Sequence, residues 1–392
     1  MLAKGLAQRS KDINPFYVMD ILAQAKQLEQ QGRDIIHMEV GEPDFETPQP
    51  IVEAGIAALK AGKTHYTPAL GLPELREAIA NWYQTQYQLT VSPSRIVVTP
   101  GASGALLLVM GALLERDKKL LLADPGYPCN RNFARFVEGK AQGIAVGADS
   151  NYQLTAEHIN KHWDDDTQLA LVASPSNPTG TVLSRQQLSD LSTAITAKQG
   201  HFVVDEIYHG LSYDGIDTPT VLAVDKNAFV INSFSKFFGM TGWRLGWLVV
   251  PEQYESVMDR LAQNLFLASS TVSQYAALAA FNRNTLELLE QRRQIFEQRR
   301  DSLFPALNAL GLDLTATPQG AFYIYANCSN LLDERNPNSM ALSKYCLQQA
   351  GVAITPGNDF GQYQAEQYIR FAYTTNQQRL LEAVERIHTL GL

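Results

Sequence analysis

The chain has 392 residues, which is more than one hydrophobic core usually supports, so we expect a large domain with a smaller companion. Its formal net charge of -8 argues against a nucleic-acid partner, because phosphate binding needs an excess of clustered Lys and Arg. The three cysteines lack disulfide or metal-ligand spacing, and no apolar run is long enough for a leader or a membrane span. These properties favour a soluble cytoplasmic protein that handles small molecules, with no metal site and no membrane partner.

The N-terminal residues predict a helix, a strand and a turn. Apolar residues share one helical face from Val18 to Leu28, and Gly32 follows as a stop. A short strand is expected over residues 35–40. It runs into the turn formers Gly-Glu-Pro-Asp at residues 41–44, and loops of this kind often contact ligands.

Strands and helices alternate in the middle of the chain. A helical face over residues 72–82 precedes a buried strand at residues 96–99. Further short apolar runs follow at residues 120–123, 169–173, 202–204, 229–231 and 245–250. Most of them are separated by stretches long enough for a helix, and this pattern predicts an α/β fold with a mainly parallel sheet flanked by helices.

The C-terminal part predicts a smaller α/β unit. A long helical pattern extends from Ser273 toward Leu303, followed by a strand at residues 322–325 and a terminal helix. We expect a large domain over residues 46–285 and a small domain built from residues 1–45 and 286–392. Four arginines of the long helix share its polar face with glutamates, so we interpret them as solvated: Arg292, Arg293, Arg299 and Arg300.

The most informative stretch is residues 233–246, Ser-Phe-Ser-Lys-Phe-Phe-Gly-Met-Thr-Gly-Trp-Arg-Leu-Gly, directly after a predicted strand. Aromatic neighbours would desolvate Lys236 and lower its pKa, which favours the neutral amine needed to form a Schiff base. Ser233, Ser235 and Arg244 add groups able to bind a phosphate. Pyridoxal phosphate carries both an aldehyde and a phosphate, whereas a merely solvated lysine and arginine in a strand connection are the weaker interpretation.

Other predicted strand ends also carry polar groups. The loop Gly101-Ala102-Ser103-Gly104 opens an apolar helix whose first N–H groups would attract a phosphate, although small residues serve plain helix packing equally well. Asp205 ends a strand, where its carboxylate would either keep a pyridine nitrogen protonated or only cap a helix. Asn177, in a loop rich in turn formers, and Tyr208 could each donate a hydrogen bond to a cofactor oxygen.

Together these motifs resemble the class I and II aminotransferases, pyridoxal 5'-phosphate enzymes of fold type I, over nearly the whole chain. The resemblance implies that Lys236 forms the internal aldimine and that Asp205 pairs with the pyridine nitrogen. It implies that Tyr208 and Asn177 bind the phenol oxygen, and that Asn177 also faces the substrate. The remaining cofactor contacts that it implies are a phosphate site at Ser233, Ser235, Arg244 and residues 101–104, and a ring stacked on the cofactor at Tyr127.

The resemblance also implies contacts with the substrate and with a second subunit. Arg370 matches the arginine that grips the substrate carboxylate, a task suited to a planar guanidinium, and the backbone of Gly41 would line the same group. Tyr66 matches a tyrosine that reaches the phosphate of the neighbouring subunit, which implies a homodimer. Residues 266–271 lack the arginine that aspartate enzymes use for a side-chain carboxylate, so the amino donor stays open, and Ser270 stays unassigned.

The activity implied is amino transfer between an amino acid and a 2-oxo acid by a ping-pong mechanism, with Lys236 as anchor and proton shuttle. Two alternatives are weighed against it. A pyridoxal-phosphate-dependent carbon-sulfur lyase would use the same residues. A non-catalytic regulatory module would keep the fold alone, and the complete lysine stretch argues against it.

Overall fold

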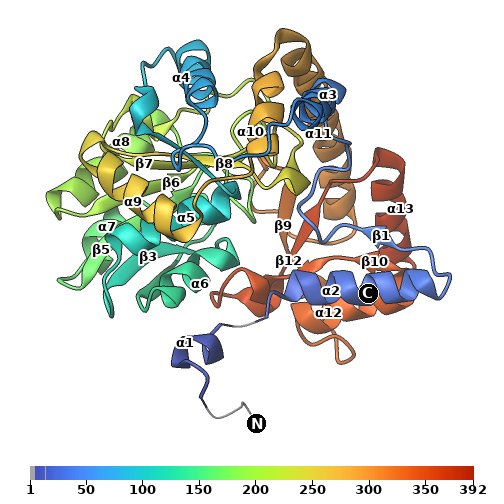
Figure 1. Cartoon of the computed structure of the whole chain (residues 1–392). Helices are drawn as coiled ribbons and strands as arrows, with labels where there is room; N and C mark the ends of the chain where they lie inside the picture. The colour runs from blue at the N-terminus through green and yellow to red at the C-terminus, as the bar shows by residue number, and fades with distance from the viewer. Residues whose placement is uncertain (1–4, 14) are drawn as a thin grey trace.

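The computed structural model describes residues 5–13 and 15–392, and a large seven-stranded sheet forms its centre (Figure 1). All neighbouring strands of this sheet are parallel except at one strand, which is antiparallel to both of its neighbours. The mainly parallel sheet expected from the alternating pattern is therefore confirmed. In spatial order the strands are β2 (Ile96–Thr99), the antiparallel β8 (Gly246–Val249), β7 (Phe229–Ser233), β6 (His201–Asp205), β5 (Thr167–Ala173), β3 (Lys119–Asp124) and β4 (Lys140–Ala145).

Apolar clusters lie on both faces of this sheet. In β6, Phe202 and Val204 join one cluster, whereas Val203 joins the other, as the alternation of a strand requires. Burial on two faces explains why the strands are continuously apolar. The first cluster includes side chains of α3 (Gln49–Lys60), α4 (Pro73–Tyr87), α7 (Ala156–His162), α8 (Arg185–Ala197) and α10 (Thr271–Leu278), and the second those of α5 (Gly101–Leu113), α6 (Pro128–Phe136) and α9 (Glu255–Leu265).

Two smaller sheets combine residues from both ends of the chain. The parallel pair consists of β1 (Ile36–His37) and β10 (Val352–Ala353), and β12 (Tyr368–Ala372) lies antiparallel between β11 (Thr355–Pro356) and β9 (Tyr323–Asn327). Around them lie α2 (Tyr17–Gln30), α11 (Arg283–Ala309), α12 (Ser339–Tyr345) and α13 (Gln377–His388), with the short α1 (Gln8–Lys11) set apart (Figure 1). In the described part of the chain, no helix has both the length and the apolar character needed to cross a membrane.

Three elements differ from the sequence-based expectation. The helix expected from Ser273 toward Leu303 is two helices, because a tight turn at residues 279–281 separates α10 from α11. The strand expected over residues 35–40 contains only two paired residues. The edge strand β4 was not predicted, since Ile144 is its only buried residue and the strand lacks an apolar run.

The interpretation of the basic cluster as solvated is wrong for two of its four arginines. Arg299 and Arg300 are each 4% exposed. The guanidinium of Arg299 binds both carboxylate oxygens of Asp44, at 2.7 and 2.8 Å. That of Arg300 binds both oxygens of Asp214, at 2.6 and 2.8 Å. These paired charges join α11 to the turn after β1 and to the segment after β6, and the glutamates at helical spacing gave no sign of such distant partners.

Candidate active site

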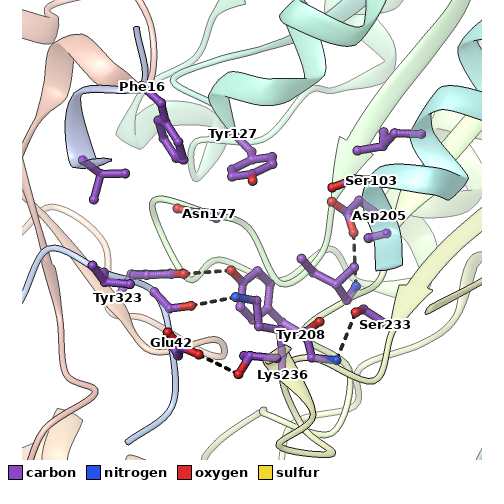
Figure 2. Close-up of a pocket in the computed structure, with 18 of the residues that line it drawn as sticks. Phe16, Glu42, Ser103, Tyr127, Asn177, Asp205, Tyr208, Ser233, Lys236 and Tyr323 are labelled. Carbon is purple, nitrogen blue, oxygen red and sulfur yellow. Dashed lines mark hydrogen bonds between the residues drawn. The ribbon is translucent and has the colours of Figure 1, made fainter. Parts of the chain in front are cut away.

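A cavity of about 350 Å³ opens at the carboxyl ends of the parallel strands, with walls from the large sheet and from the small ones (Figure 2). In α/β proteins this edge of the sheet is where ligands bind. Most of the predicted site residues line it: Gly41, Ala102, Ser103, Tyr127, Asn177, Asp205, Tyr208, Ser233, Ser235, Lys236, Arg244 and Arg370. The predicted residues Gly101, Gly104 and Tyr66 do not.

Lys236 lies in the loop after β7, with its amine directed into the cavity. Its Nζ donates to the carbonyl oxygen of Gly41 over 2.6 Å and lies 5.9 and 5.7 Å from the ring centroids of Tyr208 and Phe322. Burial of the amine lowers its pKa to about 8. A neutral, nucleophilic amine is thus accessible close to neutral pH.

Asp205 is the last residue of β6 and is 4% exposed. One carboxylate oxygen accepts the N–H of Ile207 over 3.2 Å. Burial nevertheless raises the pKa of Asp205 to about 7, although this hydrogen bond and the charge of Lys236 act in the opposite direction. A cation placed next to a carboxyl whose pKa is raised by burial stabilises its ionised form.

Tyr208 and Tyr323 form a buried hydroxyl pair beside the lysine. Their oxygens are 2.8 Å apart, and burial raises the pKa of both phenols (Figure 2). Tyr323 also explains the glycine at position 41, because a Cβ built there would lie 1.8 Å from the Tyr323 hydroxyl oxygen. Tyr323 was not among the predicted site residues, since the sequence indicated only a short strand at residues 322–325.

The N-terminus of α5 and four polar side chains form an anion cradle, which we define as Ser103, Ser233, Ser235, Arg244 and the first turn of α5. Among the described residues no side chain caps this helix. Its first N–H groups and its positive dipole end are therefore free to meet an anion. The hydroxyl oxygen of Ser233 accepts the N–H of Ser235 over 3.0 Å, which orients the loop.

Gly101 and Gly104 belong to this cradle through the first turn of α5, although neither lines the cavity. Gly101 has a φ of 70°, and a Cβ there would lie 2.6 Å from the Arg244 Nη2 atom. A Cβ at Gly104 would meet the ring of Pro100 at 2.7 Å. The first glycine thus makes room for the arginine, and the second allows the helix to pack against the residue that precedes it.

Arg370, on β12, has a buried guanidinium whose hydrogen-bond donors are only partly used by the described residues. Its Nη1 donates to the Asn177 side-chain oxygen over 2.9 Å, and its Nη2 donates to the backbone carbonyl of Glu39. Its Nε has no partner among the described residues. The guanidinium lies between the rings of Tyr323 and Phe360, at 4.3 and 4.7 Å from their centroids. A planar cation fixed in this way suits a carboxylate ligand.

Tyr66, assigned from the resemblance, and Ser270, left unassigned, both lie outside the cavity. The side chain of Tyr66 is on the surface, 82% exposed, so it does not reach the site of its own chain. Ser270 caps α10, where its hydroxyl oxygen accepts the N–H of Ser273 over 3.4 Å. The structure thus gives Ser270 a capping role, and the role of Tyr66 across an interface stays a prediction.

The cavity also has walls that the sequence did not indicate. Phe16 meets the ring of Tyr127 edge-on, with centroids 6.3 Å apart and an interplanar angle of 85° (Figure 2). Glu42 accepts a hydrogen bond from the Thr241 hydroxyl over 2.6 Å at the rim. Phe16 carries no local motif, whereas Glu42 lies in the predicted turn at residues 41–44 without having been singled out.

Comparison with known proteins identifies the family. Residues 33–387 match the family described as Aminotransferase class I and II, so the chain belongs to the class I and II aminotransferases. A valine-pyruvate aminotransferase of Mycobacterium tuberculosis is 35% identical over 376 residues, which is 96% of each chain. A (5-formylfuran-3-yl)methyl phosphate transaminase of Methanocaldococcus jannaschii is 35% identical over 385 residues, covering 97% of this chain and 98% of its own.

Solved structures agree with this assignment. The crystal structure of an aminotransferase from Mycobacterium tuberculosis superposes with a TM-score of 0.94 at 34% identity, covering 99% of both chains. The chain is accordingly an enzyme that transfers amino groups, and its fold is the fold type I architecture that the sequence predicted. The named substrates of the two curated relatives differ, so membership of the family leaves the substrate open.

Proposed function

We propose that the chain is a pyridoxal-phosphate-dependent aminotransferase that exchanges an amino group between an amino acid and a 2-oxo acid in a ping-pong cycle. One observation carries the proposal: the amine of Lys236, the buried carboxyl of Asp205 and the anion cradle line the same cavity. An aldehyde, a protonated ring nitrogen and a phosphate are the three groups that these residues suit. The proposal follows from their combination.

The residues fit pyridoxal phosphate in detail. The anion cradle would hold the phosphate, and Tyr127 would stack on the ring. Asp205 would pair with the ring nitrogen, whose positive charge would stabilise the ionised form of the buried carboxyl. When bound, this cofactor supplies an electron sink for the charge that develops at the substrate's α carbon.

The chain's own groups would divide the remaining tasks. Lys236 would anchor the cofactor through its amine and, once released by the substrate, move the proton at the α carbon. Arg370 and Asn177 would bind the substrate carboxylate, next to the backbone of Gly41. Tyr208 would donate to the phenol oxygen of the cofactor.

The proposal includes a cytoplasmic homodimer. Tyr66 lies exposed on its own chain, as a residue that serves a partner's site would. The three cysteines are free, which suits a reducing compartment. A carbon-sulfur lyase would employ the same lysine and carboxyl, and the family membership favours amino transfer over it.

A half-reaction tests the proposal. The purified enzyme loaded with pyridoxal phosphate is mixed with single amino acids in the absence of any 2-oxo acid. We expect the absorbance of the aldehyde cofactor to give way to that of the aminated cofactor, with one 2-oxo acid formed per site and no ammonia. Continuous release of ammonia with an unchanged cofactor spectrum would instead identify a lyase.

A further inference from the structure

The outer wall of the cavity is apolar and comes from the start of α2. We call Phe16, Val18 and Met19 the N-terminal wall, since all three line the cavity. Phe16 stands over Tyr127, on the side of the cavity away from Lys236 (Figure 2). Val18 is 5% exposed. A substrate held at Lys236 and Arg370 would meet this wall with its side chain.

A single distant carboxylate holds the N-terminal wall in place. The N–H groups of Tyr17 and Val18 donate to the two oxygens of Asp359, over 3.0 and 3.2 Å. These are the first two residues of α2, and the residue before them provides no side-chain cap. Asp359 is 4% exposed and therefore caps the helix from inside the protein.

The segment around Asp359 is itself bound to the site. The Arg131 guanidinium donates to the backbone carbonyl oxygen of Asp359 over 3.3 Å. The N–H of Gly126 donates to the backbone carbonyl oxygen of Phe360 over 2.9 Å. The ring of Phe360 covers the Arg370 guanidinium at 4.7 Å. Asp359 thus lies between the group proposed to bind the substrate carboxylate and the wall proposed to meet its side chain.

The charges of the cavity disfavour an acidic side chain. Of the described residues that line it, three are cationic: Lys236, Arg244 and Arg370. The proposed function assigns each of them to the cofactor or to the α-carboxylate. An acidic side chain at the N-terminal wall would lose water without gaining a cationic partner among these residues, which is costly.

We propose that Asp359 is a positioning residue that holds the N-terminal wall against Tyr127, and that this wall selects amino acids with apolar side chains. The substrate part of the inference rests on the proposed function. The positioning part rests on the hydrogen bonds of α2 and is measurable in the protein without any substrate.

Three variants separate these parts. Asp359→Ala removes both acceptor oxygens. Asp359→Asn keeps one of them, and it can still be measured if Asp359→Ala does not fold. Asp20→Asn is the control, because Asp20 is an exposed carboxylate in the first turn of the same helix.

The first readout is amide hydrogen exchange of the peptide that spans residues 16–19, by mass spectrometry with and without cofactor. We expect exchange about tenfold faster in Asp359→Ala, the factor that matches loss of a helix cap, and a smaller change in Asp359→Asn. Asp20→Asn should exchange like wild type. Unchanged exchange in both Asp359 variants would overturn the positioning role.

The second readout is the ratio of kcat/KM for leucine to that for alanine, with aspartate as the acidic comparison. We expect wild type to prefer leucine, and the ratio to fall roughly fourfold in Asp359→Ala, the order expected when a methylene group loses its apolar contact. A general loss of structure would lower both values alike. A preference for aspartate, or an unchanged ratio, would overturn the selection. Failure of the proposed function would show separately, as wild-type cofactor unaltered by any amino acid.

Discussion

Asp205 and Lys236 are both shifted from their ordinary ionisation by burial. The pKa of the carboxyl is raised to about 7 and that of the amine is lowered to about 8, so each group changes charge close to neutral pH. Such shifts are frequent at catalytic sites, although structural ion pairs also produce them. Here they occur in residues that line one cavity, together with Arg370, whose Nε has no hydrogen-bond partner in the part of the chain that the structure describes.

The lowered pKa of Lys236 predicts how the cofactor-free enzyme captures pyridoxal phosphate. The neutral amine is the attacking form, so the capture rate should rise with pH through about 8 and level off above it. An ordinary lysine would place the midpoint near ~10.4. Stopped-flow absorbance between pH 6 and ~10.4 measures the curve, and a midpoint at the ordinary lysine value would contradict the effect of burial.

Asp205→Asn tests the other shifted group. The amide has nearly the same shape as the carboxylate, so the cofactor should still bind. Because the amide cannot stabilise the positive charge of the ring nitrogen, amino transfer should slow by about 10²–10⁴-fold, as when charge stabilisation is removed from other active sites. Single-turnover rates with one amino acid are the measurement, normalised to bound cofactor. A variant with a near-normal rate would refute the pairing with the ring nitrogen.

At the scale of elements, the sequence predicted those helices, strands and site residues that a local pattern of apolar and polar residues determines. The inner strands of the large sheet are apolar on both faces, and their ends carry Lys236 and Asp205, so both strands and site were foreseeable. The edge strand β4 was not, because edge strands need no apolar run. Tyr323 reaches the cavity, and Asp359 reaches the start of α2, only through packing between segments far apart in the chain, which no local pattern encodes.

The first residue of α5 gives a prediction at this scale. Gly101→Ala places a Cβ 2.6 Å from the Arg244 guanidinium at a φ of 70°, so Arg244 must move and the affinity for pyridoxal phosphate should fall. Gly111→Ala is the matched control in the same helix, since a Cβ there meets nothing within 4 Å and should stabilise the fold by roughly 0.5–1 kcal/mol. Cofactor titration and thermal unfolding compare them, and equal affinities would contradict the close approach.

For the whole molecule, we propose the division into a large domain of residues 46–285 and a small domain of residues 1–45 and 286–392. The strands of the large sheet all lie in the first range, and those of the two small sheets lie in the second. The ion pairs of the buried Arg299 with Asp44 and of the buried Arg300 with Asp214 connect α11 to both ranges. The cavity is lined from both ranges, so its shape depends on how they are held together.

The proposed homodimer predicts complementation between two defective chains. Lys236→Ala lacks the anchor, and Tyr66→Phe lacks the hydroxyl proposed to reach the partner's phosphate. Mixed dimers, formed by refolding the two variants together, should contain one site with an intact lysine and an intact tyrosine. Cofactor titration should then show a tight-binding population that neither parent has. Its absence from mixed dimers confirmed by mass would exclude a role of Tyr66 across the interface.

The central claim is that Lys236 is the residue that holds the cofactor covalently, and reduction with borohydride tests it most directly. Treatment of the loaded enzyme should bleach its colour irreversibly and fix the cofactor to one lysine. Peptide mapping by mass spectrometry should locate that cofactor on Lys236, and Lys236→Ala should remain unlabelled under the same conditions. A label on any other lysine, or an equal label in Lys236→Ala, would contradict the account.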